Sequence, residues 1–276
     1  MKKCIVLFSG GLDSRLAVKI MQERGFEVFA VYFKLPFSKN SESEVENFSK
    51  KQKIKFDVFD CTKGKLLKEY LEVLKKTKYG RGAGFNPCVD CKIFMFRKAG
   101  EFAKKKEIIF LATGEVEGQR PMSQTARAMK IINRETGVQL IRPLTEIGIS
   151  GRSRKKQIEL AEKFKINYPS PAGGCLLCEK ELKKRFEILV GKNLINEKTL
   201  PLVNIGRHFF IKNCWFVVGR NEEENEVIEE SKGNFIESEK GKPAVYYSKK
   251  NRKSFAEELQ KDYMKGGCRE FKSERL

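Results

Sequence analysis

A short glycine-containing segment near the N-terminus, Ser9-Gly10-Gly11-Leu12-Asp13-Ser14, limits the folds open to this chain. It follows an apolar run at residues 3–8, typical of a buried parallel strand, and leads into residues 13–24, where apolar side chains recur at helical spacing. Adjacent glycines let the backbone turn tightly, and a helix N-terminus offers unpaired N–H groups to an anion. The segment lacks the Gly-Lys-Ser/Thr ending of a Walker A loop. It therefore predicts a phosphate-binding loop of another kind.

Strand-like and helix-like segments alternate along the first half of the chain, which predicts an α/β fold with a doubly wound parallel sheet. Beyond a loop rich in proline and glycine at 167–174, the pattern changes to short strands. We expect two domains: residues 1–180 with the parallel sheet, and residues 181–276 as a small α+β module ending in a charged, partly helical, solvated stretch. The expected strands are 3–8, 28–33, 56–59, 108–112, 208–211, 215–219 and 244–247, and the expected helices are 13–24, 42–53, 66–75, 91–105, 153–164 and 182–190.

The chain is strongly basic, with 56 Lys and Arg against 36 Asp and Glu and a net charge of +20. Such an excess favours an anionic partner, most simply nucleic acid, although a general bias towards basic composition would have the same effect. The apolar stretch at the N-terminus has five residues, fewer than the ~7–15 of a signal peptide, and no run reaches the ~20 residues of a membrane span. We therefore expect a cytoplasmic protein with no membrane contact.

Eight cysteines and a single histidine, His208, restrict the chemistry further. One histidine excludes multi-histidine metal sites, and it is expected to be structural. Two Cys-x-x-Cys pairs, Cys88/Cys91 and Cys175/Cys178, lie 83 residues apart. Four thiols can hold zinc, three or four can hold a [4Fe–4S] cluster, and one can carry a persulfide beside a resolving partner. The remaining cysteines, 4, 61, 214 and 268, are expected to have no role.

The Ser9–Ser14 segment resembles the S-G-G-x-D-S signature of the PP-loop ATP pyrophosphatases, whose fold is that of the adenine nucleotide alpha hydrolases. The resemblance implies that ATP is cleaved between its α and β phosphates to give an adenylated intermediate. An aspartate beside phosphates, here Asp13, is expected either to orient the loop or to meet a magnesium ion. Ala112-Thr113-Gly114 looks like a second nucleotide-contacting turn of tRNA 2-thiouridylases. The implied ligands of the pyrophosphate are Ser9, Gly10, Gly11, Asp13 and Ser14, and those of the nucleoside are Tyr32, Phe33, Thr113 and Gly114.

The first cysteine pair is similar to the N-P-x-x-x-C-N stretch of the tRNA 2-thiouridylases, which place a further functional cysteine in a later loop. The resemblance implies a catalytic or cluster-binding set of Cys88, Cys91 and Cys175. Pro171-Ala-Gly-Gly-Cys175-Leu-Leu also resembles a thiouridylase-like group in which the next residue is not cysteine. Cys178 departs from that pattern, so it is an additional possible ligand. The expected metal group is [4Fe–4S], with zinc or no metal as alternatives.

A stretch of the C-terminal module, Val218-Gly-Arg220-Asn221 followed by Asn225, is similar to the RNA-binding domain of the NFACT family. The resemblance implies RNA contact by Arg207, Arg220 and Asn221, and the alternative is a packing module around Trp215. A polar loop at 114–124 contains Gln119 and Arg120, which are expected to meet phosphates or a nucleotide. The basic segment 152–156 is expected to be either a solvated helix start or a phosphate-contacting patch.

These features together predict an ATP-dependent tRNA sulfurtransferase that makes thiouridine. It would adenylate a uridine carbonyl oxygen and replace that oxygen with sulfur from a cluster-bound sulfide or a cysteine persulfide, with Asp13, Cys88, Cys91 and Cys175 in the reaction and an external sulfur donor. The alternatives are a PP-loop ligase or amidotransferase that forms AMP and pyrophosphate on another acceptor, and a non-catalytic RNA-binding protein.

Overall fold

The computed structural model describes residues 2–38, 42–170 and 174–276. The chain divides into two compact units, Met1–Cys178 and Glu179–Leu276. Within the described ranges, every helix is too short or too polar to cross a lipid bilayer.

The first unit is built on a five-stranded sheet whose order is β3-β2-β1-β4-β5, with all neighbouring strands parallel. The direction of strand addition reverses between β1 and β4. In open sheets of this kind, ligands bind beyond the carboxyl ends of the strands at such a reversal. The expected α/β fold with a parallel sheet is confirmed. The strands are β1 (Lys2–Leu7), β2 (Phe26–Lys34), β3 (Lys55–Asp60), β4 (Phe110–Thr113) and β5 (Leu140–Ile141).

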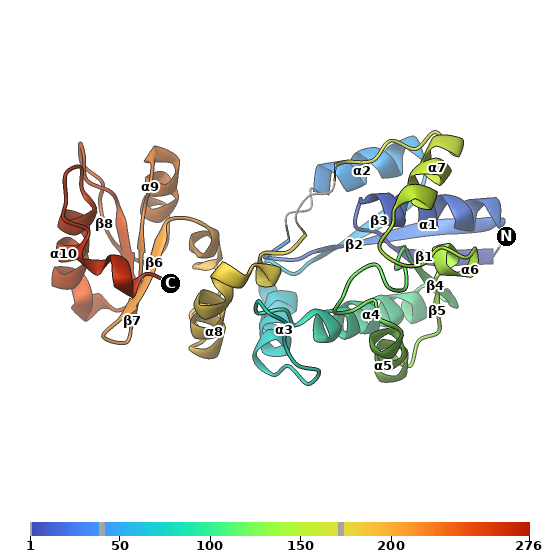
Figure 1. Cartoon of the computed structure of the whole chain (residues 1–276), viewed down its shortest axis with the longest axis horizontal. Helices are drawn as coiled ribbons and strands as arrows, with labels where there is room; N and C mark the ends of the chain where they lie inside the picture. The colour runs from blue at the N-terminus through green and yellow to red at the C-terminus, as the bar shows by residue number, and fades with distance from the viewer. Residues whose placement is uncertain (1, 39–41, 171–173) are drawn as a thin grey trace. The chain divides into compact units, whose positions relative to one another are not determined.

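Helices cover both faces of this sheet (Figure 1), with α1, α2 and α7 on one face and α3, α4 and α5 on the other. The short helix α6 packs beside α1. The helices are α1 (Leu12–Glu23), α2 (Glu42–Lys51), α3 (Gly64–Lys75), α4 (Cys88–Lys105), α5 (Ala126–Thr136), α6 (Pro143–Glu146) and α7 (Lys155–Lys163).

Alternating side chains of β1 are buried on both faces of the sheet, because a strand directs successive residues to opposite sides. Val6 packs in one cluster with Leu16 and Met21 of α1, whereas Ile5 points to the opposite face and is equally buried. Each such side chain stabilises the fold by about 1.5–3 kcal/mol through burial. This double burial explains why the strand is a continuous apolar run.

The second unit contains a four-stranded antiparallel sheet of order β6-β7-β9-β8 with α10 packed against it. This matches the expected small α+β module. The expectation that the charged C-terminal stretch is a solvated surface is wrong for α10, because Phe255, Ala256 and Leu259 recur at helical spacing and are buried in the core of the unit. The elements are α8 (Lys183–Gly191), β6 (Arg207–Ile211), β7 (Cys214–Val218), α9 (Glu222–Glu229), β8 (Asn234–Ile236), β9 (Val245–Tyr247) and α10 (Lys253–Tyr263).

Three further helices, α5, α6 and α9, are missing from the sequence-based expectation, although α5 and α9 each begin at a residue that caps a helix N-terminus. The Thr125 hydroxyl accepts a hydrogen bond from the Ala128 N–H, and the Asn221 side chain accepts one from the Glu224 N–H. Such N-caps satisfy N–H groups that have no partner within the helix. The helix α4 also begins three residues earlier than expected, so Cys88 and Cys91 both belong to its first turn.

Candidate functional site

The phosphate loop connects β1 to α1 at the reversal of the sheet. Gly10 has a φ of +80°, a conformation that side chains disfavour, and the Ser14 hydroxyl donates to the Gly11 carbonyl at 2.9 Å. The hydroxyl groups of Ser9 and Ser14 are 3.4 Å apart. Two hydroxyls and the N-terminus of α1 thus face the same turn, which suits a phosphate group.

Arg15 anchors this loop from beneath, a role that the sequence alone did not suggest. Its side chain is buried, and its Nε donates to the Gly10 carbonyl at 2.6 Å. One Nη donates to the Asn167 carbonyl at 2.6 Å, and the other pairs with Glu44 at 2.8 Å. Arg15 therefore joins the loop to α2 and to the segment that follows α7.

Asp13 lies in the first turn of α1, and its carboxylate accepts a hydrogen bond from a glutamine that is in turn bonded to a second glutamine. Gln119 Nε2 donates to Asp13 Oδ2 at 2.9 Å, and Gln157 Nε2 donates to Gln119 Oε1 at 3.4 Å. Burial raises the pKa of Asp13, while the Gln119 bond and the charges of Arg154 and Arg120 oppose that rise. The second oxygen, Oδ1, is buried without a hydrogen-bond partner among the described residues. A free carboxylate oxygen beside a phosphate loop fits a magnesium ion.

Gly114 brings β4 against the phosphate loop. A Cβ at this position would lie 2.5 Å from the carbonyl carbon and oxygen of Asp13 and 2.7 Å from the Ser14 nitrogen. Only glycine allows this approach, so the turn after β4 and the loop after β1 form one continuous surface. Thr113, the last residue of β4, is buried beside it.

The two aromatic residues expected near adenine, Tyr32 and Phe33, lie close to the carboxyl end of β2. Both side chains are buried, and the Phe33 ring stacks on Phe59 with centroids 4.9 Å apart. Both side chains thus belong to the packed interior at this end of the sheet. Their contact with a nucleoside stays a prediction.

Three thiols meet at the same edge of the sheet. Cys88 Sγ lies 3.9 Å from Cys178 Sγ, and Cys175 also donates to Cys178. Hydrogen bonds from Cys175 and Cys88 lower the pKa of Cys178, and the same bonds raise the pKa of both donors. Cys178 is also the exposed member of the group. Cys178 is thus central to the group, whereas sequence patterns alone suggested only a possible additional member.

Backbone contacts hold this thiol loop between two other segments. The Leu176 N–H donates to the Phe37 carbonyl at 2.9 Å, just beyond β2, and Cys175 forms an antiparallel bridge with Ser38. On the other side, the Asn86 N–H donates to the Leu177 carbonyl at 2.8 Å. These bonds place Cys175 and Cys178 at the carboxyl end of β2, next to the strand that leads to the phosphate loop.

Cys91 has a different partner from the other three thiols. It is buried, its sulfur lies 3.4 Å from the Tyr70 hydroxyl, and burial raises its pKa to about 12. Cys4, Cys61 and Cys214 are buried and Cys268 is exposed, as expected.

The thiols as they stand do not form a metal-ligand set. A zinc ion with ~2.3 Å bonds would hold sulfurs about 3.8 Å apart, and the Cys88–Cys178 pair is near that separation, whereas Cys91 contacts Tyr70 instead. Within residues 2–38, 42–170 and 174–276, no group of three or more His, Cys, Asp or Glu side chains is arranged to hold a metal ion. A [4Fe–4S] cluster or zinc on Cys88, Cys91 and Cys175 therefore stays a prediction that iron, sulfide and zinc analysis would check.

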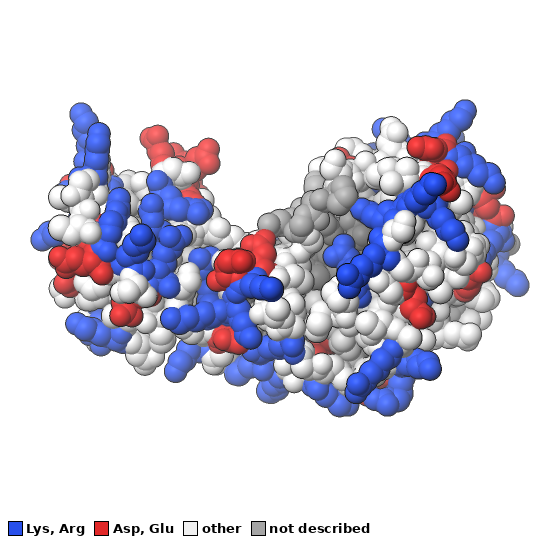
Figure 2. All heavy atoms as spheres, viewed as in Figure 1, with Lys and Arg blue, Asp and Glu red and all other residues white. Residues whose placement is uncertain are grey.

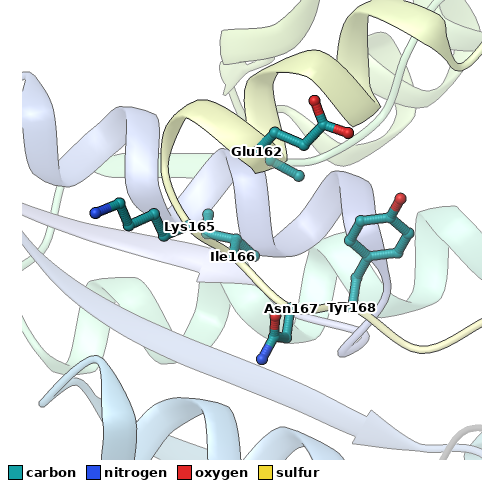
Figure 3. A pocket seen from close by; sticks show the side chains of 6 residues that line it. Glu162, Lys165, Ile166, Asn167 and Tyr168 are labelled. Carbon is teal, nitrogen blue, oxygen red and sulfur yellow. The ribbon is translucent and has the colours of Figure 1, made fainter.

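Two hollows on the described surface lie away from these groups. One, of about 440 Å³, lies where α7 ends and is lined by Glu162, Lys165 and Tyr168 among others (Figure 3). The other, of about 630 Å³, lies between α3 and α4. Neither is lined by the phosphate loop or by a cysteine, so we assign no role to them.

In the second unit, two residues expected to contact RNA have structural roles. Arg220 forms an ion pair with Glu224, and Asn221 caps α9. Lone His208 is also structural, because it is fully buried and accepts a 3.0 Å hydrogen bond from Trp215 Nε1 on Nδ1.

Other arginines of this unit remain close together. The guanidinium groups of Arg207 and Arg269 lie 5.3 and 4.7 Å from the centre of the Tyr263 ring. Burial and the charges of Arg269, Arg275 and Arg220 lower the pKa of Arg207. Basic side chains are distributed over the face of each unit seen in Figure 2, with uncharged and acidic ones between them.

Comparison with known proteins assigns the chain to a family. A family model described as "Thiamine biosynthesis protein (ThiI)" matches residues 1–173. The chain belongs to the ThiI family. The match covers the phosphate loop, Gly114 and the first Cys-x-x-Cys pair of this ThiI-family chain, and it ends just before Cys175.

Several named proteins are relatives of this ThiI-family chain. A probable tRNA sulfurtransferase of Methanosarcina mazei is 27% identical over 217 residues, which is 74% of this chain and 48% of the relative. A tRNA-specific 2-thiouridylase of Nitratiruptor is 33% identical over 118 residues, 41% of this chain and 34% of the relative. The chain thus spans about half or less of the length of these relatives. A 4-thiouridine synthetase solved with RNA and ATP is 20% identical, with a TM-score of 0.46 over 90% of this chain and 55% of that chain.

Proposed function

We propose that this protein is an ATP-dependent tRNA sulfurtransferase that adenylates a uridine carbonyl oxygen and replaces it with sulfur. The observation that carries the proposal is that one edge of the sheet bears both a phosphate loop, after β1, and a group of thiols bonded to the segment after β2. The family and the names of the relatives support it. Adenylation explains why the two belong together, since it turns a poor leaving oxygen into a good one before a sulfur nucleophile attacks.

The adenylation half uses the residues around α1. The N-terminus of α1, with Ser9 and Ser14, would hold the β and γ phosphates, and the free Oδ1 of Asp13 would bind a magnesium ion on ATP. Magnesium would supply charge neutralisation of the phosphates. The uridine oxygen attacks the α-phosphorus, the bond to the β-phosphate oxygen breaks, and pyrophosphate leaves.

The sulfur half uses Cys178 and Cys88. The Cys178 thiolate attacks the outer sulfur of an external persulfide, forms a Cys178 persulfide and releases the donor as a thiolate. Its terminal sulfur then attacks the activated uridine carbon, and AMP leaves. Finally Cys88 attacks Cys178 Sγ, losing its proton to water. The Cys178–sulfur bond breaks with its electron pair on the transferred sulfur, which yields thiouridine and a Cys88–Cys178 disulfide that a dithiol must reduce.

The geometry supports this pairing of Cys88 with Cys178. Their sulfurs are 3.9 Å apart, so a modest side-chain movement would bring them to the ~2.05 Å of a disulfide. Cys178 has the lowest thiol pKa of the group and is exposed, as a thiol that accepts sulfur from a donor must be. Cys175 donates a hydrogen bond that stabilises this thiolate.

The test is an in vitro reaction of the full chain with unmodified tRNA, ATP and a persulfide donor, followed by mass spectrometry of nucleosides and a pyrophosphate assay. We expect Cys178→Ser and Cys88→Ser to lower thionucleoside formation about 100-fold or more, while single-turnover pyrophosphate release stays within about threefold. Asp13→Asn should abolish both thionucleoside formation and pyrophosphate release. Cys268→Ser, at an exposed cysteine outside the group, is the matched control.

Different outcomes would exclude different parts of the proposal. Thionucleoside formation that survives Cys178→Ser would contradict the sulfur route. Pyrophosphate release without any thionucleoside, unaffected by either cysteine change, would favour a ligase or amidotransferase. No ATP cleavage with any tRNA would leave an RNA-binding protein.

A further inference from the structure

The polar loop after β4 joins the phosphate loop to the thiols through two consecutive residues. Gln119 donates to Asp13 at 2.9 Å. Arg120, its neighbour, lies against the other loop, because a Cβ on Gly174 would be 3.3 Å from an Arg120 Nη. Gly174 immediately precedes Cys175. A single dipeptide therefore spans the distance between the two halves of the site.

The charge of Arg120 acts on both halves. Its guanidinium is close enough to Asp13 on one side and to Cys178 on the other for its positive charge to act on both groups. Within residues 2–38, 42–170 and 174–276, no ion pair joins Arg120 to a carboxylate, and its side chain is exposed. A planar guanidinium with five donors is the group best suited to hold a phosphate by two parallel hydrogen bonds.

We propose that Arg120 binds the phosphate of the adenylated substrate and thereby holds the activated carbon between the phosphate loop and Cys178. This inference rests on the proposed function. The remaining phosphate of the adenylate must stay at the site when pyrophosphate leaves, and it carries the leaving group of the sulfur step. Arg120 then neutralises charge on the departing AMP, while Gln119 keeps the loop attached to Asp13.

A chemical measurement on the full chain tests this placement without turnover. The metal-free, reduced protein is alkylated with iodoacetate, which is anionic, or with iodoacetamide, which is neutral, and the rate at Cys178 is read by peptide mass spectrometry. Two unit charges 4 Å apart in water interact with about 1 kcal/mol, or about fivefold in rate. We therefore expect Arg120→Gln to lower the iodoacetate-to-iodoacetamide rate ratio at Cys178 about fivefold, with Arg120→Lys lying between the two.

The second part of the experiment repeats the alkylation with saturating AMP and measures the affinity for AMP. In the unmodified chain bound AMP should lower the rate ratio, because its phosphate adds negative charge beside Cys178, and Arg120→Gln should bind AMP about tenfold more weakly. Arg127→Gln, at an exposed arginine of α5, is the control and should leave the ratio unchanged.

The inference would be overturned if Arg120→Gln left the rate ratio unchanged, or if the variant and the unmodified chain bound AMP equally tightly. These readouts also separate it from the proposed function. If tRNA is never thiolated but the ratio and the AMP affinity respond to Arg120, then the sulfurtransferase proposal fails while the anion site stands as that of another adenylating enzyme.

Discussion

Arg15 illustrates how one buried side chain shapes a ligand loop. It places a cation beneath Gly10 and uses three nitrogens, two on backbone carbonyls and one on Glu44. Removing it would leave the Gly10 and Asn167 carbonyls without these donors, and an unsatisfied buried group costs about 1–3 kcal/mol.

We expect Arg15→Ala to destabilise the first unit by about 2–4 kcal/mol and to weaken ATP binding, because the loop loses its anchor. Urea unfolding followed by circular dichroism, together with calorimetric titration of ATP, measures both effects. Lys19→Ala, which removes an exposed i,i+4 pair with Glu23, should cost less than about 0.5 kcal/mol. Equal effects of the two changes would contradict the anchoring role.

His208 makes the stability of the second unit depend on pH. Burial and the charge of Arg185 lower its pKa well below 6.5. Protonation would also break the hydrogen bond that Nδ1 accepts from Trp215. Below pH 6.5 the unfolded chain binds a proton that the folded chain does not, so this contribution to stability is complete above 6.5 and is lost as the pH falls towards the folded pKa.

The expected loss is about 1.4 kcal/mol per pH unit below 6.5. Trp215 is the only tryptophan of the chain, so its fluorescence in urea titrations at pH 7.5, 6 and 5 reports on this unit alone. His208→Gln should flatten the dependence while lowering stability at pH 7.5. An unchanged pH dependence in that variant would show that other groups cause it.

The elements β1 and β4 position the site together, since their carboxyl ends carry the phosphate loop and Gly114. The register of the two strands pairs Leu7 with Thr113, which sets the glycine beside Asp13. The close approach leaves no room for a methyl group.

Gly114→Ala should therefore move the phosphate loop and weaken ATP binding about tenfold or more, with a loss of about 1–3 kcal/mol in stability. Titration of ATP and thermal unfolding would measure these changes. Gly191→Ala is the comparison: a Cβ there meets nothing within 4 Å at the end of α8, so ATP affinity should not change. Full ATP affinity in the Gly114→Ala variant would show that the turn is not part of the nucleotide site.

Across the whole chain, the net charge of +20 would attract the phosphates of tRNA if the protein modifies tRNA. The second unit contributes Arg207 and Arg269 beside Tyr263, and Arg220 is already paired with Glu224. We infer that this arginine group, rather than Arg220 and Asn221, contacts the tRNA backbone.

A plot of log affinity against log salt concentration has a negative slope. Each of Arg207→Ala and Arg269→Ala should make that slope less steep by about one if each arginine contacts one phosphate. Fluorescence titration of labelled tRNA at several salt concentrations measures the slope. Lys242→Ala, which removes a lysine already paired with Glu239, should change it little. An unchanged slope in both arginine variants would place the tRNA contact elsewhere.

Local patterns in the sequence were sufficient for the parallel sheet, the tight turn between β1 and α1 and most element positions, because strand and helix periods and glycine turns depend on neighbouring residues. They also led correctly to relatives among the tRNA-thiolating proteins and to a structural His208. They failed for α10, where charge concealed a buried apolar face, and for the helices announced only by Thr125 and Asn221.

The assembly of the site depended on tertiary structure. Gln119 meets Asp13 across 106 positions of sequence, Cys88 meets Cys178 across 90, and Arg15 meets Asn167 across 152. Which distant residues meet is decided by strand order, register and loop packing, and these are properties of the packed core as a whole. The sequence alone therefore determined which chemical groups this protein has, and the fold decided that Cys178 and Arg120 lie at the candidate site with Asp13 and Cys88.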